Sequence, residues 1–217
     1  MIDLHTHSIL SDGDLLPAEL ARRAEEKGIE IIAITDHVDD GTLDNVLSQL
    51  VKSCSAVNER CVIRALPGVE ITHVHPEQIG ALAARARDLG AKIVVVHGET
   101  LVEPVYRGTN RKGLESDIDI LAHPGLLAED DARLAAERKI AVEISGRRGH
   151  CLANGHVVRL WYEYGFPLVL NTDTHAPENL FTDEFARNVV LAAGVSEGEV
   201  QKVLDNSRAL AEKALKL

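Results

Sequence analysis

The chain begins with Met1-Ile-Asp-Leu-His-Thr-His-Ser-Ile-Leu-Ser-Asp-Gly13, and this stretch predicts both a strand and a metal-binding motif. An apolar start followed by His5 and His7 is typical of a short strand, in which side chains at i and i+2 point to the same face. Asp12 follows in a Ser-Asp-Gly turn. Two imidazoles on one strand face with a carboxylate just beyond suit Zn, Mn or Fe. Taken alone, the motif is equally compatible with surface polar residues.

Composition indicates an ordinary globular protein. With 217 residues, 45% of them hydrophobic and 26% charged, we expect a single domain spanning 1–217. The net charge of −11 argues against a basic nucleic-acid-binding or membrane-binding face. Three cysteines without a Cys-x-x-Cys pair suit a reducing compartment. Because neither a signal peptide nor a membrane-spanning apolar run stands out, we expect a cytoplasmic protein with no membrane association, and its oligomeric state stays open.

Apolar segments alternate regularly with helical patterns along the chain. After the opening strand, we expect buried strands at 29–35, 61–69, 92–96, 119–122, 140–144 and 167–170. Helical patterns lie at 15–28, 42–58, 76–90, near 110, and at 129–138, 156–165, 182–193 and 196–214. Such alternation predicts an α/β fold with a parallel sheet, either open and doubly wound or closed into a barrel.

The positions of the polar residues favour the barrel. Ligand-type side chains stand at the carboxyl ends of different predicted strands: His5 and His7, His37, Glu70, His97, His123, and Asp173 with His175. An open sheet would keep its outer strands too far apart for these groups to meet, whereas the strands of a barrel share one mouth. Converging imidazoles repel one another when they are protonated, and neighbouring carboxylates repel one another; metal ions would resolve both conflicts. We therefore expect a TIM-like (β/α)7 barrel that holds two or three metal ions sharing a bridging carboxylate.

Several short motifs carry a resemblance to a known family. They are His5-Thr-His-Ser with Ser11-Asp-Gly13, Thr35-Asp-His37, Pro67-Gly-Val-Glu70, Val96-His-Gly98, Ala122-His-Pro-Gly125 and Thr172-Asp-Thr-His175. In this order they resemble the PHP (polymerase and histidinol phosphatase) superfamily over nearly the whole chain. The resemblance implies a distorted seven-stranded barrel with a trinuclear Mn, Zn or Fe site.

The resemblance also implies three sets of metal ligands: His5, His7, Glu70 and Asp173; Asp12, His37 and His175; and Glu70, His97 and His123, with Glu70 as the bridge. Position 12 is His in some members of the family, so we expect Asp12 to influence which metal is preferred. Glu70, Asp173 and His175 are the expected catalytic residues. All nine positions hold ligand-competent residues, which speaks against a degenerate member.

A metal site of this kind suits phosphate chemistry. A bound ion lowers the pKa of water from 15.7 towards about 7, and paired ions can hold a phosphate for in-line attack. We therefore expect a stand-alone phosphatase, similar to histidinol-phosphate phosphatases, that acts on a small phosphorylated substrate. Arg147 and Arg148 follow a predicted strand, and Arg107 lies in the loop after His97, so these guanidinium groups are candidate phosphate ligands. His73 and His75 could contact substrate, whereas His150 and His156 follow no pattern.

Three rival readings stay open. Segments Val94–Glu99, Thr109–Arg111 and Asp119–Pro124 are also similar to the barrel subunit of ribonuclease P, which would make the chain an RNA-binding scaffold. A PHP-type nuclease or nucleotidase is the second, although few aromatic residues are present to stack on bases. The third, a mononuclear amidohydrolase, usually needs a lysine at a strand end, and none stands there. We rank the phosphoesterase first, the scaffold second and the amidohydrolase third.

Overall fold

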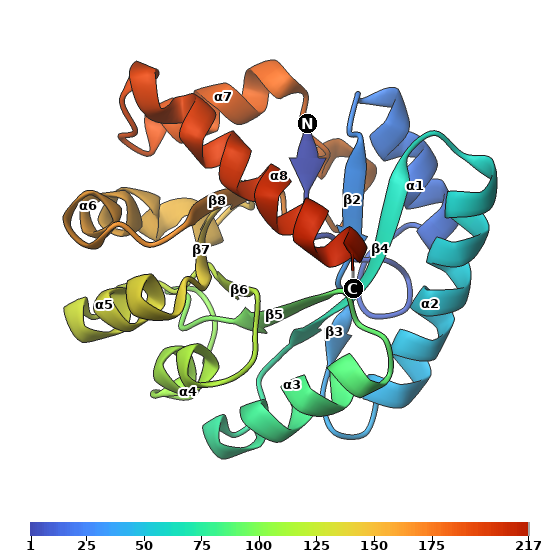
Figure 1. Ribbon diagram of the computed structural model, residues 1–217, viewed down its shortest axis with the longest axis horizontal. Coiled ribbons are helices and arrows are strands. Elements are labelled where there is room, and N and C mark those ends of the chain that lie inside the picture. Colours follow the sequence, from blue (N-terminus) through green and yellow to red (C-terminus); the bar gives the residue numbers. More distant parts are fainter. Residues whose placement is uncertain (217) are drawn as a thin grey trace.

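The strands form one parallel sheet that curls into a nearly closed barrel (Figure 1). The computed structural model describes residues 1–216. The strands pair in the order β1-β2-β4-β5-β6-β7-β8, with the short β3 beside β4. Their bounds are β1 Ile2–Asp3, β2 Ile31–Ile34, β3 His37–Val38, β4 Arg64–Ile71, β5 Ile93–His97, β6 Ile120–Ala122, β7 Ala141–Ser145 and β8 Leu168–Asn171.

The barrel closes between its first and last strands, just beyond their carboxyl ends. The backbone N–H of Asp173 donates to the carbonyl of His5 at 3.0 Å, and that of His7 donates to Thr174 at 2.8 Å. Lower down, the Asn171 side chain accepts a hydrogen bond from the Leu4 N–H at 2.9 Å. The predicted seven-stranded (β/α) barrel is thereby confirmed, and closure brings the first and last predicted ligand motifs side by side.

Eight helices surround the barrel (Figure 1). They are α1 Pro17–Glu26, α2 Leu43–Arg60, α3 Ile79–Asp88, α4 Thr109–Glu115, α5 Glu129–Arg138, α6 Asn154–Tyr164, α7 Asp183–Ala192 and α8 Val200–Lys216. Local sequence explains their limits: Pro17 occupies the first turn of α1, where its missing N–H is harmless, and Gly28 follows that helix with φ of +82°. No helix among residues 1–216 combines the length and the apolar character that crossing a bilayer requires.

Two apolar cores stabilise the fold. The larger fills the layer between strands and helices. The smaller lies inside the barrel and includes Ile2, Ile31 and Ile93 from the amino ends of three strands, together with Ala211 and Ala214 of α8. Because α8 covers the amino end of the barrel, the carboxyl end is the open one. That end is where barrel enzymes place their active sites.

Most element boundaries differ from the predicted ones by a few residues, and the two ends of β4 matter for the site. Strand β4 begins at Arg64 rather than at residue 61, because Cys61 still closes the last turn of α2 and Arg64 is the first residue paired with β2. It also runs through Glu70 to Ile71, since β3 pairs with these two residues. Glu70 therefore lies inside a paired strand, a more rigid position than the strand-end loop expected from sequence.

A substitution at Gly98 tests how tightly the backbone is packed at the carboxyl end of the barrel. A Cβ on Gly98 would lie 2.3 Å from the Ala122 carbonyl oxygen and 2.7 Å from the Pro124 Cα, both backbone atoms. We expect Gly98→Ala to lower the free energy of unfolding by about 1–3 kcal/mol, because the backbone must shift to relieve the overlap. Urea denaturation measures the change. Gly198→Ala is the control, since nothing lies within 4 Å of its Cβ position; equal stability of the two variants would contradict this packing.

Candidate metal centre

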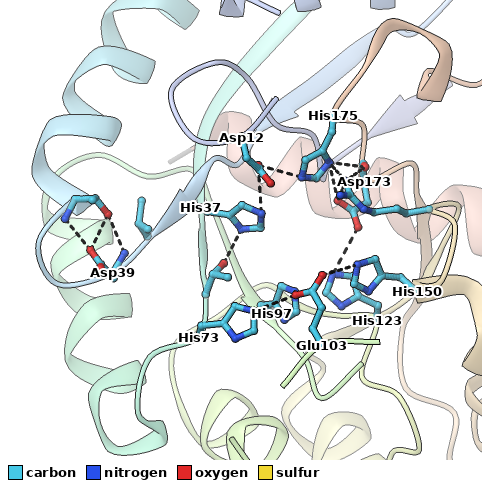
Figure 2. A pocket seen from close by; sticks show the side chains of 14 residues that line it. Asp12, His37, Asp39, His73, His97, Glu103, His123, His150, Asp173 and His175 are labelled. Atoms are coloured by element: carbon cyan, nitrogen blue, oxygen red, sulfur yellow. Dashed lines mark hydrogen bonds and ion pairs between the residues drawn. The ribbon is translucent and has the colours of Figure 1, made fainter. Parts of the chain in front are cut away.

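A cavity of about 340 Å³ opens at the carboxyl ends of the strands (Figure 2). Six of the nine predicted ligands line it: Asp12, His37, His97, His123, Asp173 and His175. The other three, His5, His7 and Glu70, are fully buried and contact the residues that line it. The structure therefore brings all nine predicted ligands together from six different strands or strand ends.

Glu70 lies at the centre of the cluster. Its Oε1 is 3.3 Å from His5 Nε2 and 3.4 Å from His123 Nε2. Its Oε2 is 2.8 Å from His37 Nδ1 and 3.6 Å from His7 Nε2. One carboxylate thus faces four imidazoles, two on each oxygen, which is the arrangement that a bridging ligand requires.

Asp173 faces the same imidazoles from the end of β8. Its Oδ1 is 3.4 Å from His7 Nε2, and its Oδ2 is 3.7 Å from His123 Nε2. Asp173 has φ of +54° and His123 has φ of +27°, in the left-handed region that non-glycine residues rarely adopt. Such strain is found at functional sites, where surrounding structure holds a side chain in one direction.

Asp12 joins two imidazoles near the rim. Its Oδ1 lies 3.1 Å from His175 Nε2 and 3.4 Å from His37 Nε2. Together with His7, these residues offer four ligand atoms that all lie within 4.8 Å of one another. On the opposite side of the cavity, His97, His123 and His150 form another such group. The site therefore contains several groups of side chains that could hold a metal ion.

Burial and neighbouring charges shift the pKa values of the side chains in the cluster. Burial opposes protonation of His5, but Glu70, Glu143 and Asp173 outweigh it and raise its pKa well above the usual value. Burial likewise disfavours ionised Glu70, yet His5, His37 and His97 hold its pKa well below the ordinary range. Burial and the neighbouring His37 lower the pKa of His7 to about 3, which makes His7 a neutral ligand at pH 7.

Unpaired polar atoms in the cluster test whether divalent ions fit. Both ring nitrogens of His7, both carboxylate oxygens of Glu70 and the Nε2 of His5 are buried without hydrogen-bond partners. Nitrogen and oxygen atoms nonetheless face one another at 3.3–3.6 Å. Two ligand atoms that are each about 2.0–2.2 Å from one ion lie about 3–3.5 Å apart. The donor set therefore fits divalent cations between the imidazoles and carboxylates.

Hydrogen bonds behind the imidazoles fix their orientation. His5 Nδ1 lies 2.9 Å from Glu143 Oε2, and Glu143 also accepts from Asn171 at 2.8 Å. Glu143 thus holds the His5 ring with its other nitrogen directed into the cluster. Asp3 and Asp36 do not: Asp3 accepts from the Thr172 hydroxyl at 2.6 Å, and Asp36 accepts from the Ser8 and Ser11 hydroxyls. They brace the backbone around the motifs.

Of the three arginines predicted to bind substrate, the structure places one at the cavity. Arg147 lines it, with Nη1 donating to the Asp173 carbonyl at 3.3 Å and lying 3.7 Å from Asp173 Oδ1. Arg147 also contacts the His175 ring. Arg107 and Arg148 are exposed and are not among the residues that line the cavity. Both lie in loops whose course cannot be predicted from strand spacing.

Two cavity residues escaped sequence reasoning. Glu103 lies in the loop 98–108 and reaches into the cavity, and His150 opens a short 3₁₀ helix, His150–Ala153. Neither stands at a strand end, so the strand-end pattern did not select them. Their only sequence signal is that each follows a ligand-bearing or arginine-bearing loop at the barrel mouth. Burial and the neighbouring His123 lower the pKa of His150 to about 4.

Several curated proteins are similar in sequence to most of the chain. Protein MJ1295 of Methanocaldococcus jannaschii is 45% identical over 208 residues, which are 93% of this chain and 94% of that protein. The 5'-3' exoribonuclease Rnm of Salmonella typhimurium is 28% identical over 75% of this chain, and the matched part is 48% of the length of Rnm. A Shewanella loihica protein bearing the name Probable phosphatase is 26% identical, over 83% of this chain and 80% of that protein.

Solved structures share the fold. A chain of archaeal ribonuclease P matches with a TM-score of 0.74 at 17% identity, over 100% of this chain and 92% of that chain. A candidate histidinol phosphatase from Listeria monocytogenes matches with a TM-score of 0.61 at 11% identity, over 85% of this chain and 99% of that chain. The sequence profile of the PHP domain matches residues 3–217. Because this profile covers nearly the whole sequence, the chain belongs to the PHP domain family.

Proposed function

We propose that the protein is a metal-dependent phosphoesterase that hydrolyses a small phosphate monoester, as histidinol-phosphate phosphatases do. The observation that carries this proposal is the convergence of nine ligand-type side chains on one cavity of about 340 Å³ that also holds Arg147. The cavity is large enough for a phosphate group and part of a small leaving group. The family relatives named as a phosphatase and an exoribonuclease support the same class of chemistry.

We assign two or three Mn, Zn or Fe ions to the cluster, in the three ligand sets that the sequence suggested: His5, His7, Glu70 and Asp173; Asp12, His37 and His175; and Glu70, His97 and His123. Bound ions would polarise phosphoryl oxygens and lower the pKa of a water molecule. Glu70 would contribute to two sets, since its carboxylate faces His5 and His7 of one set and His123 of another. Its low pKa keeps it ionised for this role.

The other two proposed catalytic residues position the cluster. The Asp173 carboxylate faces His7 and His123, and its backbone carbonyl accepts from His175 Nδ1 at 3.0 Å. The other ring nitrogen of His175, Nε2, is directed at Asp12. Asp173 and His175 follow β8 and thereby connect the buried part of the cluster to the rim of the cavity, where the phosphate would enter.

Arg147 binds the phosphate in this proposal. Its side chain is 31% exposed, so it can reach a ligand in the cavity while Asp173 holds it in place. We expect Arg147→Ala to lower kcat/KM by roughly 10- to 150-fold, since one charge-assisted contact contributes about 1.5–3 kcal/mol. Steady-state kinetics with elemental analysis would show weaker turnover at unchanged metal content. The neighbouring, exposed Arg148→Ala is the control; equal losses in both variants would contradict the role of Arg147.

A nuclease is the second candidate function, and the similarity to Rnm favours it over a scaffold or an amidohydrolase. An amidohydrolase lacks support at the site, because none of the described residues that line the cavity is a lysine. An RNA scaffold would leave the nine-residue cluster without a use.

Phosphate release from monoesters, together with the lengths of the oligonucleotide products, separates these candidates. Protein loaded with Mn, Zn or Fe is assayed against histidinol phosphate, nucleoside monophosphates and short oligonucleotides, with and without chelator. The proposal expects chelator-sensitive release from a monoester. Cleavage of oligonucleotides alone would favour the nuclease. No turnover in any metal form, together with tight RNA binding by metal-free protein, would favour the scaffold.

A further inference from the structure

The loop between β5 and α4 carries a carboxylate into the cavity. Glu103 Oε2 lies 2.9 Å from His73 Nε2 and 3.1 Å from His97 Nε2, and its Oε1 lies 3.3 Å from His150 Nε2 (Figure 2). Three imidazoles from three separate segments thus converge on one side chain that neither the motifs nor the ligand sets above include.

The hydrogen bond made by His97 Nδ1 indicates which ring nitrogen carries the proton, and therefore what Nε2 can bind. His97 Nδ1 lies 3.1 Å from the Gly98 carbonyl oxygen, which can only accept, so Nδ1 carries a proton. In the neutral ring Nε2 therefore presents a lone pair, and that lone pair faces the Glu103 carboxylate at 3.1 Å. Two electron-rich atoms at this distance repel each other unless a proton or a cation lies between them. The distance fits a hydrogen bond from a protonated ring, and it also fits two ligands of one ion, which lie about 3–3.5 Å apart.

His150 approaches the same place from the other side. Its side chain is 4% exposed, and its ring centroid lies 4.2 Å from that of His123. Its Nδ1 is hydrogen-bonded to the Thr100 hydroxyl at 2.8 Å, which leaves Nε2 directed into the cavity. The ligand atoms of His97, His123 and His150 lie within 4.8 Å of one another.

We propose that Glu103 and His150 complete the coordination of the ion held by His97 and His123. This inference rests on the proposed metal centre and adds two ligands to it. Four protein ligands beside Glu70 leave little room for water, which is typical of a site that stabilises structure rather than one kept open for chemistry. The ion then fastens the loop 98–108 to the barrel, and His73 orients Glu103 through its contact with Oε2.

The base of this loop is fixed without the ion. Glu99 Oε1 accepts hydrogen bonds from the N–H groups of Gly108 and Asn110, at 3.0 Å each. Metal binding should therefore order the middle of the loop, where Glu103 lies, and leave its ends unchanged.

Metal content and hydrogen exchange test the proposal on full-length protein. Wild type, Glu103→Gln and His150→Gln are loaded with Mn or Zn, dialysed, and analysed for bound metal. We expect each variant to hold one ion fewer than wild type, or to bind that ion at least about 10- to 100-fold more weakly. Metal should slow amide exchange in residues 100–106 of wild type and not of Glu103→Gln. The exposed Glu115→Gln is the matched control and should behave as wild type.

The outcomes distinguish this inference from the proposed function. Unchanged metal content and affinity in both variants would overturn the inference, even if turnover falls, because Glu103 and His150 would then act on substrate alone. Circular dichroism identifies any variant that does not fold, and Glu103→Asp then replaces Glu103→Gln, with partial loss of the same ion expected. A wild-type protein that binds no metal would overturn both proposals.

Discussion

Glu70→Gln should reduce kcat/KM for the phosphate ester by on the order of 10³-fold, which would be the largest effect of any single substitution in the cluster. Glutamine keeps the shape of the buried side chain but removes the negative charge that four imidazoles face. It also replaces one ligand oxygen with an amide NH₂ group, which cannot bind a cation. A residue proposed to bridge two sets of ligands should therefore affect both ions.

Kinetics together with elemental analysis measures this loss. Glu143→Gln serves as a graded comparison, because Glu143 acts on the cluster through the Nδ1 of His5 and should matter about 10- to 100-fold. The exposed Glu163→Gln should change neither turnover nor metal content. Glu70→Gln protein with wild-type metal content and turnover would show that Glu70 is not a bridging ligand.

Removal of metal should also lower stability by a large amount. Glu70, Asp173 and the rings of His5, His7 and His123 are almost fully buried, and unpaired nitrogen and oxygen atoms of this group face one another. An ion that binds only the folded state stabilises it by about 2.7 kcal/mol when present at a hundredfold excess over its Kd. For a domain of this size, that corresponds to a fall in Tm of roughly 5–10 °C per ion removed.

Differential scanning calorimetry before and after chelation, with residual metal measured, gives the change. Re-addition of Mn should restore the original Tm, and Glu70→Gln should respond much less to chelator than wild type. A melting curve that stays the same after verified loss of metal would mean that the cluster is stable without cations.

The barrel could be predicted because each strand-end motif has a fixed place. His5 with His7, His97 and His123 follow short apolar strands directly, and parallel strands in a barrel bring their carboxyl ends to one mouth. Strand β3 could not be predicted, since two residues, His37–Val38, carry no periodicity. Its pairing with β4 is a tertiary interaction that extends β4 beyond Glu70.

The loop residues could be predicted only in part. Arg147, Arg148 and Arg107 look alike in sequence, yet only Arg147 lies at the cavity, because Asp173 accepts its hydrogen bond. Glu103 lies six residues beyond His97 in a long loop whose path depends on hydrogen bonds made by Glu99. His150 is placed by the Thr100 hydroxyl, fifty residues away. Such long-range contacts have no counterpart in local sequence patterns.

The claim that these side chains form a metal centre of two or more ions is tested most directly by anomalous X-ray diffraction from crystals grown with Mn. The account predicts strong anomalous peaks among these residues, including one near His5, His7, Glu70 and Asp173 and one near Asp12, His37 and His175. A further peak is predicted near His97 and His123. A well-ordered crystal with Mn in excess and no anomalous density among these residues would contradict it.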